Sequence, residues 1–403
     1  MKILVFNAGS SSHKLCLFSL EETLSRASHS LLWKAQIDWY PQRREATIAI
    51  ESGDGQTRAE TTNFDAKREV LARVLATIET SAPLDGNLDG NLDAVGHRVV
   101  HGGDRYRDST RIDATAKREI AKLIPFAPAH NPVNLEGIDL LEKIFAGVPQ
   151  FAVFDTAFHS AMPCVAATYP GAYDWFDRGI RRYGFHGISH QYCTRRAAQL
   201  LDRPVADLKL ITCHLGNGCS LAAVAGGRSV DTTMGFTPLD GLMMGTRSGA
   251  IDPGIAVHLL REGMSADDLD RVLNKESGLK GISGVSHDLR EIDAAIAAGN
   301  ERAQLALDLF VHRLKAGIGA MLMSLGGVDA IVFAGGVGEH HAAIRAAACD
   351  ALGFLGVEVD TVRNEGTAGD RDITTADSTV RVLVVRTQEE LEIARECVRQ
   401  LRA

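Results

Sequence analysis

Short apolar runs separated by small, polar turns recur along the chain. The run at residues 3–6 ends in a polar turn at 7–12, and a second apolar run follows at 15–20, which is the spacing of a β-hairpin. Residues 210–215 repeat this arrangement: the apolar run is followed by a turn, Gly216-Asn217-Gly218, and then by a returning apolar run at 220–225. The same strand–turn–strand pattern therefore opens both halves, and we interpret it as an internal duplication.

Strand-like and helical segments alternate in the rest of the sequence. Residues 148–153 and 329–334 are short apolar runs typical of buried strands. Between 303 and 325, apolar residues recur every three or four positions, which predicts a long amphipathic helix. A last strand is expected at 382–385 and a closing helix at 389–401. This alternation is typical of α/β architecture.

Length and composition limit the class of protein. The chain has 403 residues, which favours two domains, and a formal net charge of −8, which disfavours binding to nucleic acid. Its seven cysteines are odd in number and form no C-x-x-C pair, so neither a disulfide framework nor a thiolate zinc site is expected. No apolar stretch has the length of a signal peptide or membrane helix, so we expect a cytoplasmic protein without a membrane partner.

Three glycine- or serine-rich turns are candidates for binding phosphate. The turn at 7–12 offers small residues and hydroxyl groups, with Lys14 just beyond it. Gly216-Asn217-Gly218 occupies the equivalent place in the second half, although a plain hairpin turn explains both segments equally well. The glycines at 335–338 follow a strand and precede a helical stretch, where α/β sheets bind nucleotides. No P-loop motif occurs.

Arginine, histidine and carboxylate side chains next to glycine-rich segments suggest an anion site. Arg98 and Arg247 lie among small or apolar residues, where a guanidinium group can grip a carboxylate or phosphate with two hydrogen bonds. His186 and His190 have the spacing of helical zinc ligands but lack the glutamate of H-E-x-x-H, so an anion-lining role is favoured over zinc. Asp155 ends a strand and Glu389 begins the last helix, and such carboxylates can hold Mg²⁺.

Together these segments resemble the acetate kinase family, which belongs to the superfamily of actin and the sugar kinases. The matching blocks occur in family order over the whole chain, at residues 7–12, 97–103, 127–132, 154–159, 182–187, 213–218, 233–253, 284–286, 333–339 and 389–391.

The resemblance implies two actin-like (ribonuclease H-like) domains related by duplication, with the active site in the cleft between them. The expected domains are residues 1–154 with 390–403, and residues 155–389. The implied reaction is the reversible transfer of phosphate from ATP to acetate, giving acetyl phosphate and ADP, with Mg²⁺ (or Mn²⁺ as a substitute) as cofactor. A homodimer is also implied.

The same resemblance implies a role for each matching residue. The catalytic residues would be Asp155, His186, Arg247, Arg98 and His130, and the metal ligands would be Asn7 and Glu389. The acid would be contacted by Arg98, Val100, Ala129, Phe185 and Pro238. The nucleotide would be contacted by Ser10, Ser12, Lys14, His214, Gly216, Asn217, Gly218, Asp288, Leu289, Arg290, Gly335, Gly336, Val337, Gly338 and His340.

A few residues depart from the family pattern. Leu289 and His340 replace a usual phenylalanine and asparagine near the adenosine, and Ala129 replaces a leucine that usually narrows the acid pocket. The last change favours use of a larger acid, so a propionate or butyrate kinase with the same mechanism competes with an acetate kinase. A non-catalytic ATP-binding module would not need the two arginines and His186, and a zinc enzyme would be recognised by metal analysis.

Overall fold

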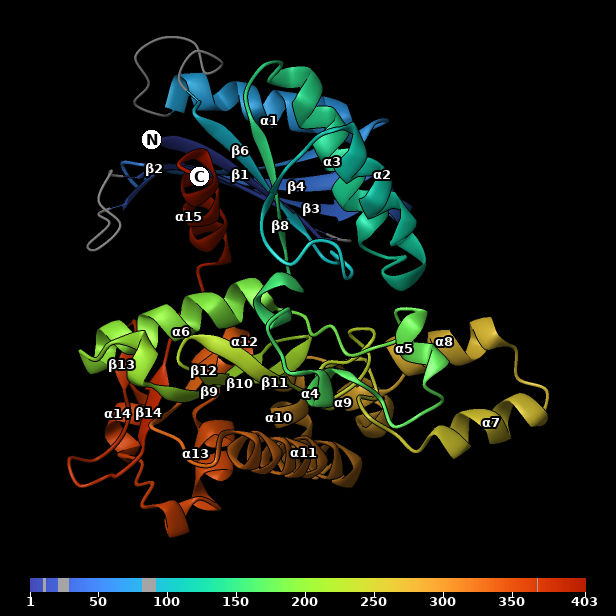
Figure 1. The fold of residues 1–403 in the computed structure, drawn as a ribbon, viewed down its shortest axis with the longest axis vertical. Helices are drawn as coiled ribbons and strands as arrows, with labels where there is room; N and C mark the ends of the chain where they lie inside the picture. Colours follow the sequence, from blue (N-terminus) through green and yellow to red (C-terminus); the bar gives the residue numbers. More distant parts are fainter. Residues whose placement is uncertain (10–11, 21–28, 82–91, 368) are drawn as a thin grey trace. The chain divides into compact units, whose positions relative to one another are not determined.

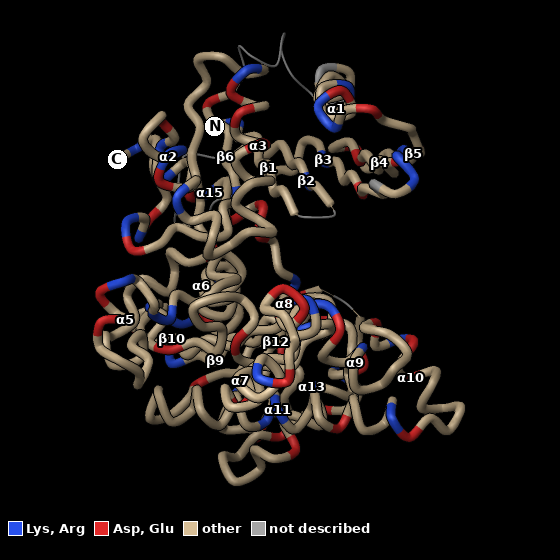
Figure 2. The backbone as a smooth tube through the Cα atoms, turned by 90° about the vertical axis from the view of Figure 1, so that its right-hand side faces the viewer, with Lys and Arg blue, Asp and Glu red and all other residues tan. Residues whose placement is uncertain are grey.

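The computed structural model describes residues 1–9, 12–20, 29–81, 92–367 and 369–403. The chain forms two compact units, residues 1–157 with 388–403 and residues 158–387 (Figure 1). Each unit is built around one mixed β-sheet. In the described ranges, no helix is both long and apolar enough to cross a membrane. Figure 2 shows basic and acidic residues interspersed along the backbone of each unit, without a continuous basic stripe.

The first unit contains an eight-stranded sheet in the order β5-β4-β3-β2-β1-β6-β8-β7. Its strands are β1 (Lys2–Ala8), β2 (Ser12–Leu20), β3 (His29–Tyr40), β4 (Glu45–Ser52), β5 (Thr57–Asn63), β6 (Ala94–Val99), β7 (Thr110–Arg111) and β8 (Gln150–Phe154). Its helices are α1 (Lys67–Ser81), α2 (Ala114–Lys122), α3 (Asn131–Ile144) and α15 (Glu389–Leu401).

The second unit contains a six-stranded sheet in the order β11-β10-β9-β12-β14-β13. Its strands are β9 (Lys209–Leu215), β10 (Cys219–Ala225), β11 (Arg228–Thr232), β12 (Ala330–Ala334), β13 (Arg371–Asp372) and β14 (Arg381–Val384). Its helices are α4 (Cys164–Ala167), α5 (Asp174–Asp177), α6 (Gly187–Leu201), α7 (Pro253–Arg261), α8 (Ala266–Lys275), α9 (Gly278–Ser283), α10 (Leu289–Ala297), α11 (Glu301–Leu325), α12 (Gly335–His340), α13 (Ala342–Asp350) and α14 (Thr361–Glu365).

The two sheets share one central topology, as the predicted duplication requires, and the first sheet has two additional edge strands, β4 and β5. In the first, β1 pairs antiparallel with β2, β2 pairs antiparallel with β3, and β1, β6 and β8 run parallel. In the second, β9, β10 and β11 form the same antiparallel meander, and β9, β12 and β14 run parallel. The turn at 216–218 joins the first and second strands of the second sheet, and in the first sheet the equivalent connection runs from Ala8 to Ser12.

Each sheet is covered by helices, which explains why its central strands are almost continuously apolar. In the first unit, α1 and α3 lie over one face and α15 lies against the other (Figure 1). In the second unit, α6 packs over one face and the long helix α11 over the other (Figure 1). A strand that is buried on both faces loses the alternation of apolar and polar residues, as β1 and β12 do.

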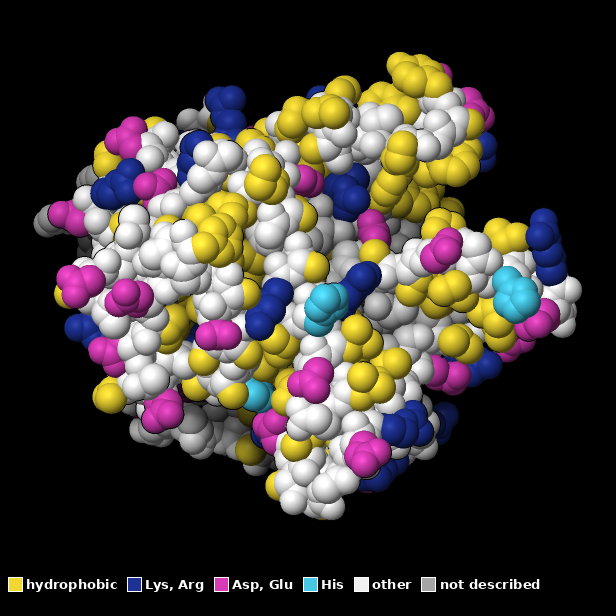
Figure 3. Space-filling model, turned by 90° about the horizontal axis from the view of Figure 1, so that it is seen from below, with side chains coloured by type: hydrophobic (Ala, Val, Ile, Leu, Met, Phe, Trp, Pro, Cys, Tyr) yellow, Lys and Arg dark blue, Asp and Glu magenta, His cyan; other side chains and the backbone are white. Residues whose placement is uncertain are grey.

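Not every apolar side chain is covered in this way. Helix α7 has no buried residue, and its Ile255, Val257 and Leu260 are exposed. On the face of the molecule shown in Figure 3, apolar side chains lie scattered among charged ones. Scattered exposed apolar residues are ordinary on protein surfaces and do not by themselves mark a site.

The close packing of α15 on the first sheet gives a stability prediction. A Cβ atom added at Gly96 of β6 would lie 2.6 Å from Cys397 Sγ and 2.7 Å from Ile393 Cγ2 of α15. We expect Gly96→Ala to lower the free energy of unfolding by about 1–3 kcal/mol, measured by urea denaturation, because the helix must move away from the strand. Gly319→Ala is the control, because nothing lies within 4 Å of an added Cβ on that face of α11. An unchanged stability in Gly96→Ala would contradict this packing.

Candidate active site

The parallel strands of the first unit bring an arginine and an aspartate together. Arg98 lies in β6 and Asp155 directly follows β8, its neighbour in the sheet. Arg98 Nε lies 3.0 Å and 3.2 Å from the two carboxylate oxygens of Asp155, and Nη2 lies 2.6 Å from Oδ2. Asp155 is 1% exposed. Although burial opposes it, the Asp155 carboxylate raises the pKa of Arg98 above its usual value, so this guanidinium stays charged.

Asn7 links this ion pair to the start of α15. It lies near the end of β1, and its Oδ1 accepts a hydrogen bond from Arg98 Nη1 at 3.4 Å, while its Nδ2 donates to Glu390 Oε1 at 3.0 Å. Lys14 Nζ lies 3.9 Å from the same Glu390 oxygen. Glu390 is therefore a member of this polar cluster that was not expected from the sequence. Its position beside Glu389 at a helix N-terminus was the available signal.

Oxygen donors at this place could hold a divalent cation. Loss of solvent raises the pKa of Glu389 to about 7, and the negative charges of Asp155 and Glu390 act in the same direction. A carboxylate held under such repulsion gains from a nearby divalent cation. In the part of the chain that the structure describes, no three His, Cys, Asp or Glu side chains gather to hold a metal by themselves. The donors fit Mg²⁺, which is commonly bound by one or two carboxylates with water and phosphate, better than a closed zinc site.

The other predicted residues of the first unit lie around this cluster or apart from it. Val100 is buried and donates its N–H to Asn134 Oδ1 at 3.2 Å. His130 immediately precedes α3, and Ala129 before it is exposed. Ser12 begins β2, and Ser10 lies outside the described residues.

In the second unit, His186 is held by backbone and side-chain contacts. It precedes α6 with φ +56°, a left-handed conformation that is uncommon for a residue with a side chain. Its Nδ1 lies 2.9 Å from Ser220 Oγ on β10. Its ring lies over that of His214, with ring centroids 4.3 Å apart, and His214 Nδ1 lies 2.8 Å from Ser189 Oγ. These contacts fix the orientation of both imidazoles.

Arg247 faces the same point as His186. Its Nη1 donates to Pro238 O at 3.0 Å and lies 3.7 Å from Met244 Sδ. Among the described residues, no Asp or Glu side chain pairs with it, and burial lowers the pKa of its guanidinium. A Cβ atom added at Gly218 would lie 3.3 Å from His186 Nε2 and 3.5 Å from Arg247 Nη1. Gly218 thus leaves open the space that a small anion between these two groups would need.

A cavity of about 710 Å³ begins beside this point. Eight of the residues expected to bind nucleotide line it: Gly216, Asn217, Asp288, Leu289, Arg290, Gly336, Val337 and His340. Its size and mixed lining suit a nucleotide. Six further lining residues were not expected from the sequence: Leu279, His287, Asp293, His341, Ala342 and Ala343. Most of them are close in the chain to residues that were expected, and this proximity is the only feature of the sequence that could have identified them.

The two remaining glycines of the 335–338 segment shape the backbone and do not line this cavity. Gly335 has φ +75°, and a Cβ there would lie 2.7 Å from Leu215 O. Its N–H donates to Glu339 Oε1 at 3.1 Å, an oxygen that also accepts from the N–H of Thr387. The segment is thereby the first turn of α12, held against the ends of β9 and β14.

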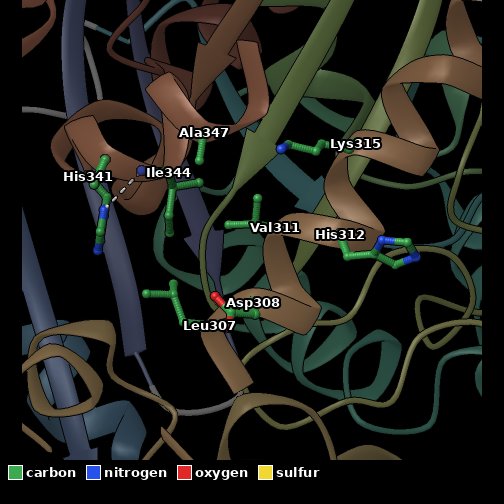
Figure 4. Close-up of a pocket in the computed structure, with 9 residues that line it drawn as sticks. Leu307, Asp308, Val311, His312, Lys315, His341, Ile344 and Ala347 are labelled. Carbon is green, nitrogen blue, oxygen red and sulfur yellow. Dashed lines mark hydrogen bonds between the residues drawn. The ribbon is translucent and has the colours of Figure 1, made fainter. Parts of the chain in front are cut away.

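A second cavity of about 400 Å³ lies between α11 and α13 and shares His341 and Ala343 with the first (Figure 4). Its wall is mainly apolar. Figure 4 shows Lys315 pointing toward the space between the helices, whereas His312 points away. His341, which caps α13 and lies 3.1 Å from Asp293, lines both cavities.

The buried ion pair of the first unit yields a prediction. Asp155→Asn keeps the shape of the side chain but removes the carboxylate that lies 2.6 Å from Arg98, so this buried guanidinium loses its nearest counter-ion. We expect the free energy of unfolding to fall by about 3–5 kcal/mol. Asp139→Asn is the control, because Asp139 pairs with Lys117 at an exposed site and should contribute less than about 1 kcal/mol. Thermal and urea unfolding would measure both. If both substitutions lowered the free energy of unfolding equally, the buried Arg98–Asp155 pair would contribute no more to stability than an exposed ion pair.

Comparison with known proteins places the chain in a family. The model of the acetokinase family matches residues 2–395. An acetate kinase from Gloeobacter violaceus is 56% identical over 405 residues and is covered, like this chain, over 100% of its length. The crystal structure of the Porphyromonas gingivalis acetate kinase has a TM-score of 0.88 and 38% identity, covering 100% of both chains. A propionate kinase from Francisella tularensis has a TM-score of 0.87 and 36% identity, covering 98% of each. The chain belongs to the acetokinase family.

Proposed function

We propose that this protein transfers the γ-phosphoryl group of ATP to the carboxylate of acetate, reversibly, forming acetyl phosphate and ADP. One observation carries this proposal. The nucleotide-sized cavity begins at Gly216 and Asn217, and the next residue, Gly218, is the one that His186 and Arg247 both face. Phosphates of a nucleotide in this cavity would therefore end between the imidazole of His186 and the guanidinium of Arg247, which pairs with no carboxylate in the described part of the chain.

Such a site supplies what phosphoryl transfer asks of a protein. The transferred group spreads negative charge over three equatorial oxygens, and the protein contributes alignment and charge stabilisation more than covalent chemistry. Arg247 would donate two parallel hydrogen bonds to these oxygens, and His186 would donate one from Nε2. His214 and the glycines at 216 and 218 would hold the phosphates that stay with the nucleotide.

The polar cluster of the first unit would serve the acid and the metal. Arg98 would bind the carboxylate, with Asp155 orienting it and His130 supporting the site. Asn7 and Glu389 would hold Mg²⁺, or Mn²⁺ in its place, and the bound cation would neutralise charge on the ATP phosphates. Ser10, Ser12 and Lys14 would add donors to these phosphates. The two domains expected from the sequence, residues 1–154 with 390–403 and residues 155–389, stay a prediction, as does the homodimer. The compact units divide the chain slightly differently, after residue 157 and before residue 388, so that Asp155 and Glu389 belong to the first unit.

The adenosine would lie along residues 288–290 and 335–340, which line or support the large cavity. The methyl group of the acid would contact Val100, Ala129, Phe185 and Pro238. A propionate kinase is the second candidate, because Ala129 is small and because a propionate kinase is among the similar structures. A non-catalytic nucleotide-binding module is disfavoured, because it has no need for Arg247 and His186 facing one open glycine.

A hydroxamate assay tests the proposed reaction directly. Purified protein, ATP, Mg²⁺ and acids of one to five carbons should give acyl hydroxamate with acetate, and EDTA should abolish the signal until Mg²⁺ or Mn²⁺ is restored. Formation of no acyl phosphate with any acid would overturn the proposal. Activity that needs zinc and is not supported by Mg²⁺ would overturn the metal assignment.

The open space at Gly218 gives a specific prediction. Gly218→Ala places a methyl group between His186 Nε2 and Arg247 Nη1, where an oxygen of the transferred group would lie. We expect kcat to fall about a hundredfold or more, because contacts to the developing charge are each worth a factor of about 100–1,000. Gly353→Ala, where nothing lies within 4 Å of the added Cβ, should leave kcat unchanged. Full activity of Gly218→Ala would remove this glycine from the path of the phosphoryl group.

The size of residue 129 gives a prediction about the acid. Each additional CH₂ that is buried improves binding by roughly 0.8 kcal/mol, or about fourfold. With alanine at this position, we expect kcat/KM for propionate to lie within about tenfold of that for acetate, since the hydrophobic effect alone discriminates weakly between acids one methylene apart and the small side chain does not exclude the larger acid. Ala129→Leu should raise the KM for propionate while changing that for acetate little. If the wild type rejects propionate, Ala129 does not contact the acid.

A further inference from the structure

One buried hydroxyl group joins two histidines in the second unit. Ser220 Oγ on β10 lies 2.9 Å from His186 Nδ1 and 2.8 Å from His190 Nε2. Ser220 is fully buried, and His190 is 1% exposed. The other ring nitrogen of His190, Nδ1, lies 2.7 Å from Thr212 Oγ1 on β9. The structure thus contains a continuous row of hydrogen bonds from Thr212 through His190 and Ser220 to His186.

The chemistry of a hydroxyl group couples the two imidazoles. A serine hydroxyl has one proton to donate, and it accepts hydrogen bonds through its lone pairs. Ser220 can therefore donate to only one of the two histidines and must accept from the other. If His190 carries its proton on Nε2, Ser220 accepts there and donates to Nδ1 of His186. The proton of a neutral His186 must then lie on Nε2.

The distances around Thr212 indicate that the hydrogen bonds run in this direction, with Thr212 as the donor to His190 and His190 as the donor to Ser220. Thr212 is fully buried, so its hydroxyl proton needs an acceptor inside the protein. His190 Nδ1 lies 2.7 Å from its oxygen, whereas the competing acceptor, Ala222 O, lies 3.5 Å away. A separation of 3.5 Å is at the limit of a hydrogen bond, so the proton points to His190. Nδ1 of His190 is then an acceptor, and the proton of that ring lies on Nε2.

The surroundings also oppose a positive charge on these two histidines. Burial holds the pKa of His190 well below its ordinary value, and the neighbouring His159 and His214 act in the same direction. Among the described residues, the groups that face His186 include His214 of β9, whose ring lies over it, His190 of α6 through Ser220, and Arg247, which faces the same glycine. A positive charge on Arg247 opposes a second positive charge on His186.

We infer that Thr212, His190 and Ser220 are positioning residues that hold His186 as the neutral tautomer with its proton on Nε2, directed at the transferred phosphoryl group. The inference rests on the proposed function for the identity of the group that receives this hydrogen bond. The hydrogen bond from a donor that is already in place becomes stronger as negative charge develops on the phosphoryl group. His186 then needs no change of protonation during the reaction. The relay also gives a role to His190, which is buried four residues after His186.

The first test observes the tautomers directly. In protein labelled with ¹⁵N at histidine, ring-nitrogen chemical shifts distinguish protonated from unprotonated nitrogens, and single His→Gln variants assign the signals of His186 and His190. We expect both residues to carry a proton on Nε2 and none on Nδ1 at neutral pH in the free protein. A proton on Nδ1 of either ring would overturn the inference.

The second test measures the effect on catalysis. Ser220→Ala removes the hydroxyl that fixes the tautomer, so the His186 signals should shift to an average of two tautomers. We expect kcat to fall roughly tenfold, equivalent to about 1.4 kcal/mol, with the KM values for ATP and acetate within about twofold of wild type. A change confined to KM, or a wild-type kcat, would contradict a positioning role.

Ser229→Ala is the matched control for this variant. Ser229 is also fully buried, and its Oγ lies 2.8 Å from a ring nitrogen of another histidine, His159 Nδ1. Ser229 does not belong to the relay, so Ser229→Ala should leave kcat and the His186 tautomer as in the wild type. If Ser229→Ala also lowered kcat tenfold, the effect of Ser220→Ala would be due to general disturbance of the core.

The two proposals fail in different ways. Acyl phosphate formation by a protein whose His186 carries its proton on Nδ1 would overturn the relay and leave the reaction standing. A protein with the expected tautomers that forms no acyl phosphate would keep the relay and overturn the proposed function. The wild-type tautomer measurement decides the relay even if Ser220→Ala does not fold.

Discussion

The chemistry of each unit depends on the parallel pairing of a central strand with two neighbours. Parallel strands end at the same edge of a sheet, so residues far apart in sequence meet there. In the first unit, β1, β6 and β8 bring Asn7, Arg98 and Asp155 into one hydrogen-bonded group. In the second unit, β9, β12 and β14 bring the 216–218 turn to the start of α12. The same arrangement of parallel strands therefore creates one polar edge in each sheet.

The two edges differ in how their charges are balanced. Arg98 is held by a buried carboxylate, and the resulting pair is electrically satisfied before any ligand arrives. Arg247 has only neutral partners, a carbonyl and a thioether, among the described residues. A buried guanidinium without a counter-ion is costly unless an anion completes it. Of the two edges, the second therefore favours an anionic ligand more strongly.

Close packing determines how precisely the side chains at the edge of the second sheet are positioned. A side chain at Gly218 would enter the space between His186 and Arg247, and a side chain at Gly245 would lie 2.3 Å from Asn217 Oδ1. The loop that carries Arg247 can approach the 216–218 turn only because of these glycines. The hydroxyl of Ser220 then orients His186. Glycine and serine, which contribute little to the core, here decide where the charged groups lie.

The sequence by itself determined several of the central elements and the kind of chemistry. The apolar runs predicted β1, β9, β12 and α11, the repeated turn predicted the duplication, and the order of motifs indicated the family, because these signals are local and survive in a single chain. Only the tertiary structure decided which side chains meet. It paired Arg98 with Asp155, brought Glu390 to Asn7, added residues such as Asp293 and His341 to the cavity, and linked His190 to His186 through Ser220. Those contacts join residues up to 383 positions apart, and no local pattern of apolar and polar residues carries information about partners at that distance.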